Sequence, residues 1–195
     1  MKKEMMSKSE LLNRGWTKKS IDLLLPAPTT KTNPHYKNSA PMLLWDKEEV
    51  EKMENTPEFQ EAKAKKLKRT DIASKAVETK TQKLLDEISQ YKVTIQKVSN
   101  NQLLEYTLGA KEQWYFNRGN YGFTAYGADE ETIQRWEVNF IRHNLTEYDI
   151  HCLKLFGKVG KYKAHNLLKN TVLDEIAKAY PHLAAECELQ KINNS

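Results

Sequence analysis

The chain has 195 residues, of which 39% are hydrophobic, 9% aromatic and 29% charged, and its formal net charge is +5. This composition is typical of a folded protein and too apolar for a fully disordered one. No apolar run approaches the roughly 18 residues of a membrane-spanning helix. The basic first residues lead into polar sequence, so we expect no secretion signal, no membrane partner and a cytoplasmic location.

The excess positive charge lies in the first quarter of the chain. Residues 1–45 hold eight lysine and arginine residues against three acidic ones, whereas the remaining 150 residues hold 23 of each sign. This distribution is expected where the first quarter meets an acidic partner, although a short basic end also serves simply as a solubilising surface.

Two short helices joined by a tight turn are predicted between residues 7 and 26. The segment from Ser7 to Glu10 can form a capping box, and Gly15 is placed to end the first helix in the left-handed conformation. Thr17 is a second N-cap, and the apolar stripe that follows it ends at Pro26.

An irregular or weakly paired excursion is expected from Ala27 to Ala40, because this stretch is rich in proline, threonine, asparagine and lysine. Residues 42–45 then predict a short strand, and Asp46 begins a capping box that opens another helix. We therefore place a first small domain at residues 1–55.

Residues 56–91 predict a long helix, either unbroken or with one break near Thr70 and Asp71. Its apolar positions are sparse, which suits an exposed connector between domains. The helix carries a run of basic residues that either follows a phosphate backbone or, as we favour, forms a solvated face. These residues are Lys63, Lys65, Lys66, Lys68 and Arg69.

Residues 92–195 predict a helical bundle domain. A short extended segment is expected at 93–98, followed by helices capped by Ser99 or Asn100, by Asp129 and by Thr146. Residues 161–179 give the clearest amphipathic pattern, and Pro181 starts a last short helix. Between two of these helices, residues 118–128 alternate glycine with aromatic rings, which either stack on unpaired bases or a partner protein or pack over the bundle.

The order of elements in the first fifty residues resembles the winged-helix fold of MerR-type regulators and phage excisionases. The resemblance is carried by Ser9-Glu10-Leu11-Leu12, by residues 15–21 (GWTKKSI), by Tyr36-Lys37 and by residues 44–50 (LWDKEEV). It covers about a quarter of the chain. The rest resembles an uncharacterised bacterial helical family through residues 136–143, 148–149, 156–160 and 179–181, which implies no chemistry.

The winged-helix resemblance implies duplex DNA as the partner, with the second helix in the major groove and the excursion as a wing. It assigns DNA contacts to Thr17, Lys18, Lys19, Ser20, Lys31, Asn33, His35, Tyr36, Lys37 and Asn38. The sequence departs from the pattern because Asp22 is acidic and the proposed reading helix has no arginine for bidentate guanine contact. Weak or shape-based DNA binding therefore fits better than strong sequence reading.

The overall expectation is a mainly α protein with a small N-terminal winged helix, a long connecting helix and a C-terminal helical bundle. We expect a non-enzymatic DNA-binding regulator or accessory factor whose bundle makes dimer or partner contacts. The alternative is a protein-binding adaptor, inhibitor or accessory subunit of a nucleoprotein machine from a mobile element or defence system.

Catalysis and cofactor binding have little support in the sequence. The densest polar cluster is around His143 and Asp149, which pair either as catalytic base and orienter or, as we favour, as part of a network that fixes a helix junction. Cys152 and Cys187 fit buried free thiols, and no histidine or cysteine pair follows a metal-ligand spacing. We expect no metal and no small-molecule cofactor.

Overall fold

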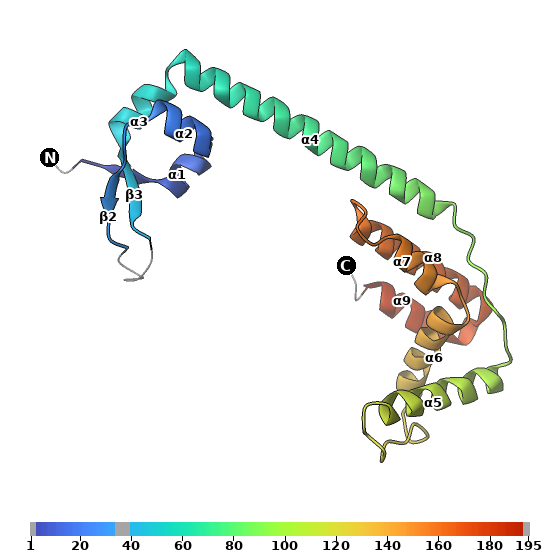
Figure 1. The fold of residues 1–195 in the computed structure, drawn as a ribbon. Coiled ribbons are helices and arrows are strands. Elements are labelled where there is room, and N and C mark those ends of the chain that lie inside the picture. Colours follow the sequence, from blue (N-terminus) through green and yellow to red (C-terminus); the bar gives the residue numbers. More distant parts are fainter. Residues whose placement is uncertain (1–2, 34–39, 193–195) are drawn as a thin grey trace. The chain divides into compact units, whose positions relative to one another are not determined.

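The computed structural model describes residues 3–33 and 40–192 (Figure 1). The chain divides into two compact units, Met1–Lys75 and Ala76–Ser195. The described residues are mainly helical, as the sequence predicts, and they also form a small sheet of three strands. Across these described ranges, no helix combines the length and apolar character needed to cross a membrane.

The N-terminal unit consists of short elements followed by the first part of one long helix. They are β1 (Met5–Ser7), α1 (Lys8–Asn13), α2 (Lys18–Leu24), β2 (Thr29–Lys31), β3 (Met42–Asp46), α3 (Lys47–Glu54) and the start of α4 (Pro57–Ser89). The predicted pair of helices and the predicted strand after the excursion are therefore present. The excursion contains β2, and β1 was not predicted at all.

The three strands form an antiparallel sheet in the order β1-β3-β2. Met6 pairs with Trp45 in β3, and Thr30 of β2 pairs with Leu43. β3 is therefore the central strand, and β2 and β3 form a hairpin that projects from the two-helix segment (Figure 1).

The core of this unit is built around Trp16, which is fully buried. Its ring centroid lies 4.3 Å from that of Phe59, so the first turns of α4 are part of the core. Trp45 is also buried and donates from Nε1 to the Pro26 carbonyl oxygen at 3.0 Å. The other buried members are Met6, Leu11, Ile21, Leu25 and Val50.

The predicted helix starts at Ser7, Thr17 and Asp46 are confirmed, but Asp46 accepts from Glu48 N at 3.0 Å and, within the described residues, forms no capping box. Ser7 and Glu10 form a capping box at the start of α1, and Thr17 is the N-cap of α2. Gly15 has φ of +106°, a left-handed conformation that side chains disfavour. The turn at Gly15 is further held by Lys66, whose Nζ donates to its carbonyl oxygen at 3.2 Å.

Glu54 ties the C-terminal end of α3 to the turn between α1 and α2. Its carboxylate accepts two hydrogen bonds from the Arg14 guanidinium and a third, at 2.9 Å, from Trp16 Nε1. The hydrogen bonds from Arg14 are the main cause that holds the pKa of Glu54 below its usual range, and the hydrogen bond from Trp16 lowers this pKa further. The ionised carboxylate is therefore the form that stabilises the folded unit.

We expect Glu54→Gln to destabilise the N-terminal unit by about 1 kcal/mol at neutral pH, a modest value because solvent reaches the Arg14 guanidinium. A lowered folded-state pKa gives stability that is present above the unfolded pKa of about 4.3 and is lost as the pH falls through the folded value. Hydrogen exchange measured between pH 7 and pH 3 gives the stability of this unit at each pH. The stability should fall with pH in the parent and fall less in Glu54→Gln.

Glu51→Gln is the matched control for this comparison. Glu51 Oε1 lies 3.9 Å from an Arg14 nitrogen, and its side chain is 46% exposed. Its removal should leave both the stability and its pH dependence nearly unchanged. Equal effects of the two substitutions would contradict a specific role for Glu54.

Helix α4 runs unbroken from Pro57 to Ser89, so the alternative with a break near Thr70 and Asp71 is wrong. Its middle is exposed, as the sparse apolar stripe predicted: Leu67 and Ile72 are more than half accessible. Pairs four residues apart, such as Lys75 with Asp71 at 2.9 Å, lie on its solvated surface. The division between the two units falls inside this helix.

The C-terminal unit holds the end of α4 and a set of packed helices. They are α5 (Asn100–Phe116), α6 (Glu130–Asn144), α7 (Tyr148–Lys154), α8 (Lys161–Ala179), the 3-10 helix η1 (Pro181–Leu183) and α9 (Ala184–Ile192). Helix α8 lies centrally and packs against α6, α7 and α9. Its buried face, which the sequence predicted, includes Leu168, Val172 and Ile176.

The connection from α4 to α5 has no regular secondary structure, so the alternating pattern at 93–98 does not form a strand. Hydrogen bonds fix this connection to the helices. Gln96 N donates to the Leu145 carbonyl oxygen at 2.9 Å, and the buried Tyr180 hydroxyl accepts from Val98 N at 3.0 Å. Backbone pairing here is therefore made with helix ends rather than with another strand.

One expectation for α7 is wrong in detail. Its N-cap is Glu147 rather than Thr146, although the Thr146 hydroxyl accepts a hydrogen bond from Tyr148 N at 3.1 Å. The helix ends at Lys154, and Phe156, which follows it, has a side chain that is 86% exposed.

Candidate nucleic-acid interface

Helix α2 presents two of the predicted contact residues to solvent. Lys18 and Lys19 are its first two residues, and both are exposed. Thr17 is half-buried and accepts a hydrogen bond from Ser20 N at 3.0 Å. The Ser20 side chain is only 7% exposed, and its hydroxyl accepts from Thr17 N at 2.8 Å. Ser20 is therefore a capping residue whose hydroxyl is engaged with Thr17.

The second part of the predicted interface lies on the β2–β3 hairpin. Lys31 is exposed at the end of β2, where it pairs with Met42. Asn33 follows it and is half-buried. The predicted contacts His35, Tyr36, Lys37 and Asn38 lie outside the described residues. The described part of the interface thus consists of Lys18, Lys19 and Lys31, with Thr17 and Asn33 beside them in sequence.

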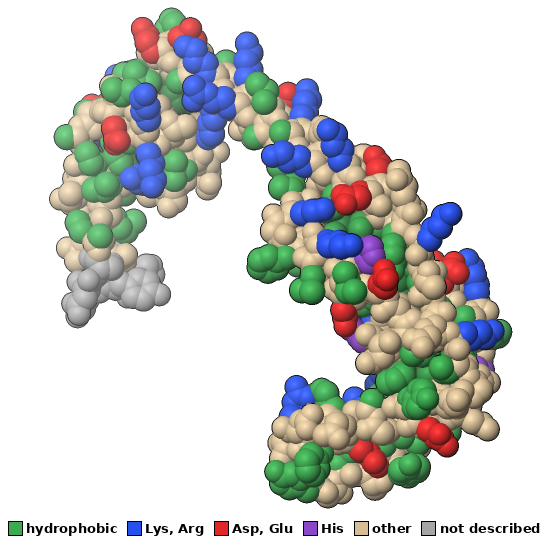
Figure 2. Space-filling view, turned by 45° about the vertical axis from the view of Figure 1, so that its right-hand side comes forward, with side chains coloured by type: hydrophobic (Ala, Val, Ile, Leu, Met, Phe, Trp, Pro, Cys, Tyr) green, Lys and Arg blue, Asp and Glu red, His purple; other side chains and the backbone are tan. Residues whose placement is uncertain are grey.

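Charge separates the two units. By sequence, residues 1–75 hold 16 basic against 11 acidic side chains, and residues 76–195 hold 15 of each sign. The whole net charge of +5 thus belongs to the N-terminal unit. Figure 2 shows lysine and arginine side chains over the visible face of this unit and along α4. The excess positive charge of the chain, which favours anions electrostatically, is therefore carried by this unit.

Helix α2 also exposes groups that do not suit a phosphate backbone. Asp22 is exposed, and Leu23 is 70% exposed, which sequence periodicity did not single out. A leucine at such a position makes apolar contact either with a thymine methyl group or with a protein surface. Substitution of Leu23 is therefore a way to test which of the two candidate partners, DNA or protein, this helix contacts.

Comparisons with known proteins returned no match to this chain among family models, curated proteins or solved structures. The residues and geometry of the chain itself are therefore what any functional assignment has to rest on.

The polar cluster around His143 forms a connected network in the C-terminal unit. His143 Nδ1 lies 2.8 Å from Asp149 Oδ1, and Arg142 Nε donates to His143 Nε2 at 3.3 Å. Arg142 also donates to Asn139 Oδ1 at 2.7 Å and to Gln190 Oε1 at 3.1 Å. The network joins α6 to the start of α7 and to α9.

This geometry favours a structural role for His143. A neutral ring that donates from Nδ1 to Asp149 and accepts from Arg142 at Nε2 satisfies both nitrogens. The nitrogen that a general base would use already faces a guanidinium. Tyr148 lies beside Arg142, and burial raises the pKa of its phenol, which therefore stays protonated at neutral pH.

The two cysteines are weak nucleophiles in these surroundings. Burial is the main cause that raises the pKa of Cys152, and it raises the pKa of Cys187 to about 11. Both thiols are free and protonated at neutral pH. Within residues 3–33 and 40–192, histidine, cysteine and acidic side chains form no group that could hold a metal ion.

Proposed function

We propose that the protein binds duplex DNA through its N-terminal unit, acting as a non-enzymatic regulator or accessory factor. The observation that carries this proposal is the confinement of the net charge to that unit, together with the exposed ammonium groups of Lys18, Lys19 and Lys31. A winged-helix arrangement is supported by the pair α1 and α2 followed by the β2–β3 hairpin. The C-terminal unit, which is neutral, would serve dimer or partner contacts.

The strength of such binding comes from phosphate neutralisation. Each lysine that neutralises a phosphate releases condensed counterions, so affinity falls steeply with salt. Since α2 carries no arginine, the proposal is for weak binding with little base discrimination. Salt dependence is therefore a better test than sequence preference.

Replacing Lys18, Lys19 and Lys31 together with glutamine is expected to lower the salt slope of log affinity by about 2.7, which is three phosphates at about 0.9 each. The loss should be nearly equal for different DNA sequences. Fluorescence anisotropy of labelled duplexes, titrated with the full chain at several salt concentrations, measures the slope. Thermal unfolding should be unchanged within about 0.5 kcal/mol, because all three side chains are exposed.

The matched control replaces three exposed lysines of the neutral unit, Lys92, Lys97 and Lys163, with glutamine. It removes the same formal charge and should keep the parent's slope. A triple variant at Lys18, Lys19 and Lys31 that also keeps the parent's slope would exclude this surface as the DNA contact. Equal losses in both variants would show only non-specific attraction.

The exposed Leu23 favours a second candidate, a protein-binding adaptor, inhibitor or accessory subunit of a nucleoprotein machine. Protein interfaces are centred on apolar anchors from which charge is largely absent. Leu23→Ser in the full chain would then abolish recovery of a stoichiometric partner from the native host and leave the salt slope unchanged. Recovery of DNA without such a partner would exclude this candidate.

A further inference from the structure

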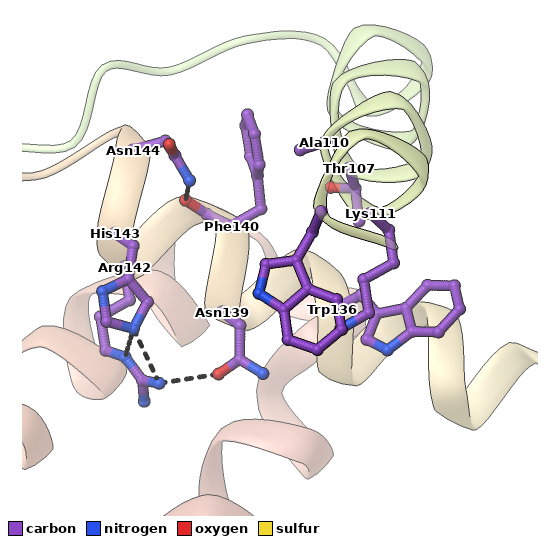
Figure 3. Close-up of a pocket in the computed structure, with 10 residues that line it drawn as sticks. Thr107, Ala110, Lys111, Trp136, Asn139, Phe140, Arg142, His143 and Asn144 are labelled. Atoms are coloured by element: carbon purple, nitrogen blue, oxygen red, sulfur yellow. Dashed lines mark hydrogen bonds between the residues drawn. The ribbon is translucent and has the colours of Figure 1, made fainter. Parts of the chain in front are cut away.

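A groove of about 380 Å³ lies between α5 and α6 of the C-terminal unit (Figure 3). This volume is within the range of small-molecule sites. Residues spaced by three or four positions on one face of each helix form most of the lining, and Arg142 and Asn144 flank His143 at the end of α6. The lining residues are Thr107, Ala110, Lys111, Trp114, Trp136, Asn139, Phe140, Arg142, His143 and Asn144.

The groove contains a partly buried cation between two indole rings. Lys111 Nζ lies 5.2 Å from the Trp114 ring centroid and 5.1 Å from that of Trp136. No lining residue is acidic, and among the described residues no carboxylate forms an ion pair with Lys111. Burial, with smaller contributions from Arg118 and Arg135, lowers the pKa of Lys111. An anion bound in the groove would supply the negative charge that neutralises the Lys111 ammonium group.

A second polar group in the groove is unpartnered. Thr107 is 2% exposed, and its hydroxyl has no hydrogen-bond partner within the described structure. Buried hydroxyl groups in folded proteins nearly always have one. Figure 3 shows Thr107 and Lys111 on the side of α5 that faces α6. The two groups that need a polar partner therefore face the same space.

Aromatic rings make up much of the remaining wall. Trp114 is 46% exposed and has the Arg118 guanidinium carbon 3.4 Å from its ring centroid, while Trp136 and Phe140 are half-buried. Aromatic side chains and guanidinium groups are the surfaces on which nucleobases stack in proteins. The polar lining residues Asn139 and His143 lie further along α6, where Arg142 holds them through the hydrogen bonds drawn in Figure 3.

We propose that this groove binds a nucleotide, with the base stacked against the indole surface and the phosphate at Lys111. The indole rings favour a ligand with a planar ring, and the Lys111 ammonium group favours a ligand with a negative charge. Free nucleoside monophosphates and the unpaired end of a nucleic-acid strand share this chemistry. The site is separate from the duplex-binding surface proposed for the N-terminal unit and does not depend on it.

The experiment uses the full chain with Lys18, Lys19 and Lys31 replaced by glutamine, so that the N-terminal surface does not contribute. The probes are AMP, UMP, adenosine, inorganic phosphate and benzoate, followed in NMR spectra by the indole N–H resonances of Trp114 and Trp136. We expect AMP and UMP to shift these resonances, and adenosine, phosphate and benzoate to bind at least about tenfold more weakly. An oligothymidylate added in the same way distinguishes a strand end from free nucleotide by which of the two binds more tightly.

Variants in the same background test the assigned roles. Lys111→Gln should weaken AMP binding about tenfold and leave adenosine binding unchanged, whereas Trp136→Leu should weaken both by about tenfold. Trp136→Phe keeps a ring and should retain most of the affinity, which separates lost stacking from lost folding. Lys97→Gln, exposed and outside the groove, is the matched control. Unmoved indole resonances at millimolar AMP, benzoate binding as tight as AMP, or full AMP affinity in Lys111→Gln would each overturn the proposal.

Discussion

Trp16→Ala is expected to lower the free energy of unfolding of the N-terminal unit by about 3 to 5 kcal/mol. Trp16 is fully buried, its ring contacts Phe59 at a centroid distance of 4.3 Å, and its Nε1 donates to Glu54. A unit of this size has roughly 0.05 to 0.15 kcal/mol of stability per residue, so the loss is a large part of the total. DNA binding by the proposed surface should fall with it.

Hydrogen exchange with peptide resolution measures this effect, because it reports on each unit separately. Peptides from α1, α2 and β3 should exchange much faster in the variant, and peptides from α8 should keep the parent's rates. Trp16→Phe is the control: it keeps an aromatic ring beside Phe59 but loses the bond to Glu54, so it should cost less. Unchanged protection of the N-terminal peptides in Trp16→Ala would contradict the place given to this residue.

Local signals explain why much of the fold could be predicted from the sequence. Capping pairs such as Ser7 with Glu10 and Ser99 with Gln102 act over three residues, so the pattern contains both partners. The three-residue strand β1 has no such pattern, because its pairing with β3 joins residues about 40 positions apart. The alternation at 93–98 indicated an extended chain, but in the part of the chain that the structure describes no strand pairs with it to form a ladder.

The candidate sites show a similar limit. Exposure of Lys18 and Lys19 was predictable because both lie off the apolar stripe of α2. The burial of Ser20 was not, since a polar residue in a short helix points either to solvent or to the cap. The α5–α6 groove requires two helix faces to meet, and no sequence spacing records which faces do so. Lys111 and Trp136 become neighbours only in the folded unit.

Gly160→Ala is expected to destabilise the C-terminal unit by about 2 to 4 kcal/mol. Gly160 is the N-cap of α8 with φ of +82°, which costs a residue with a side chain roughly 1 to 2 kcal/mol. A Cβ placed there would lie 2.7 Å from both Cγ2 and Oγ1 of Thr81 in α4. Such overpacking adds about 1 to 3 kcal/mol, because a β-branched side chain on a helix has few other rotamers.

The two contributions can be separated with a neighbouring glycine and a double variant. Gly157 has a similar φ of +74°, but a Cβ there would meet nothing within 4 Å, so Gly157→Ala should show only the backbone cost of about 1 to 2 kcal/mol. Adding Thr81→Ala to Gly160→Ala should remove the crowding and bring the loss down to that of Gly157→Ala. Denaturant unfolding of the parent, Gly160→Ala, Thr81→Ala and the double variant gives the coupling energy between the two positions. Equal losses for the two glycine variants, with no rescue by Thr81→Ala, would show that α4 does not pack against the start of α8 through these residues.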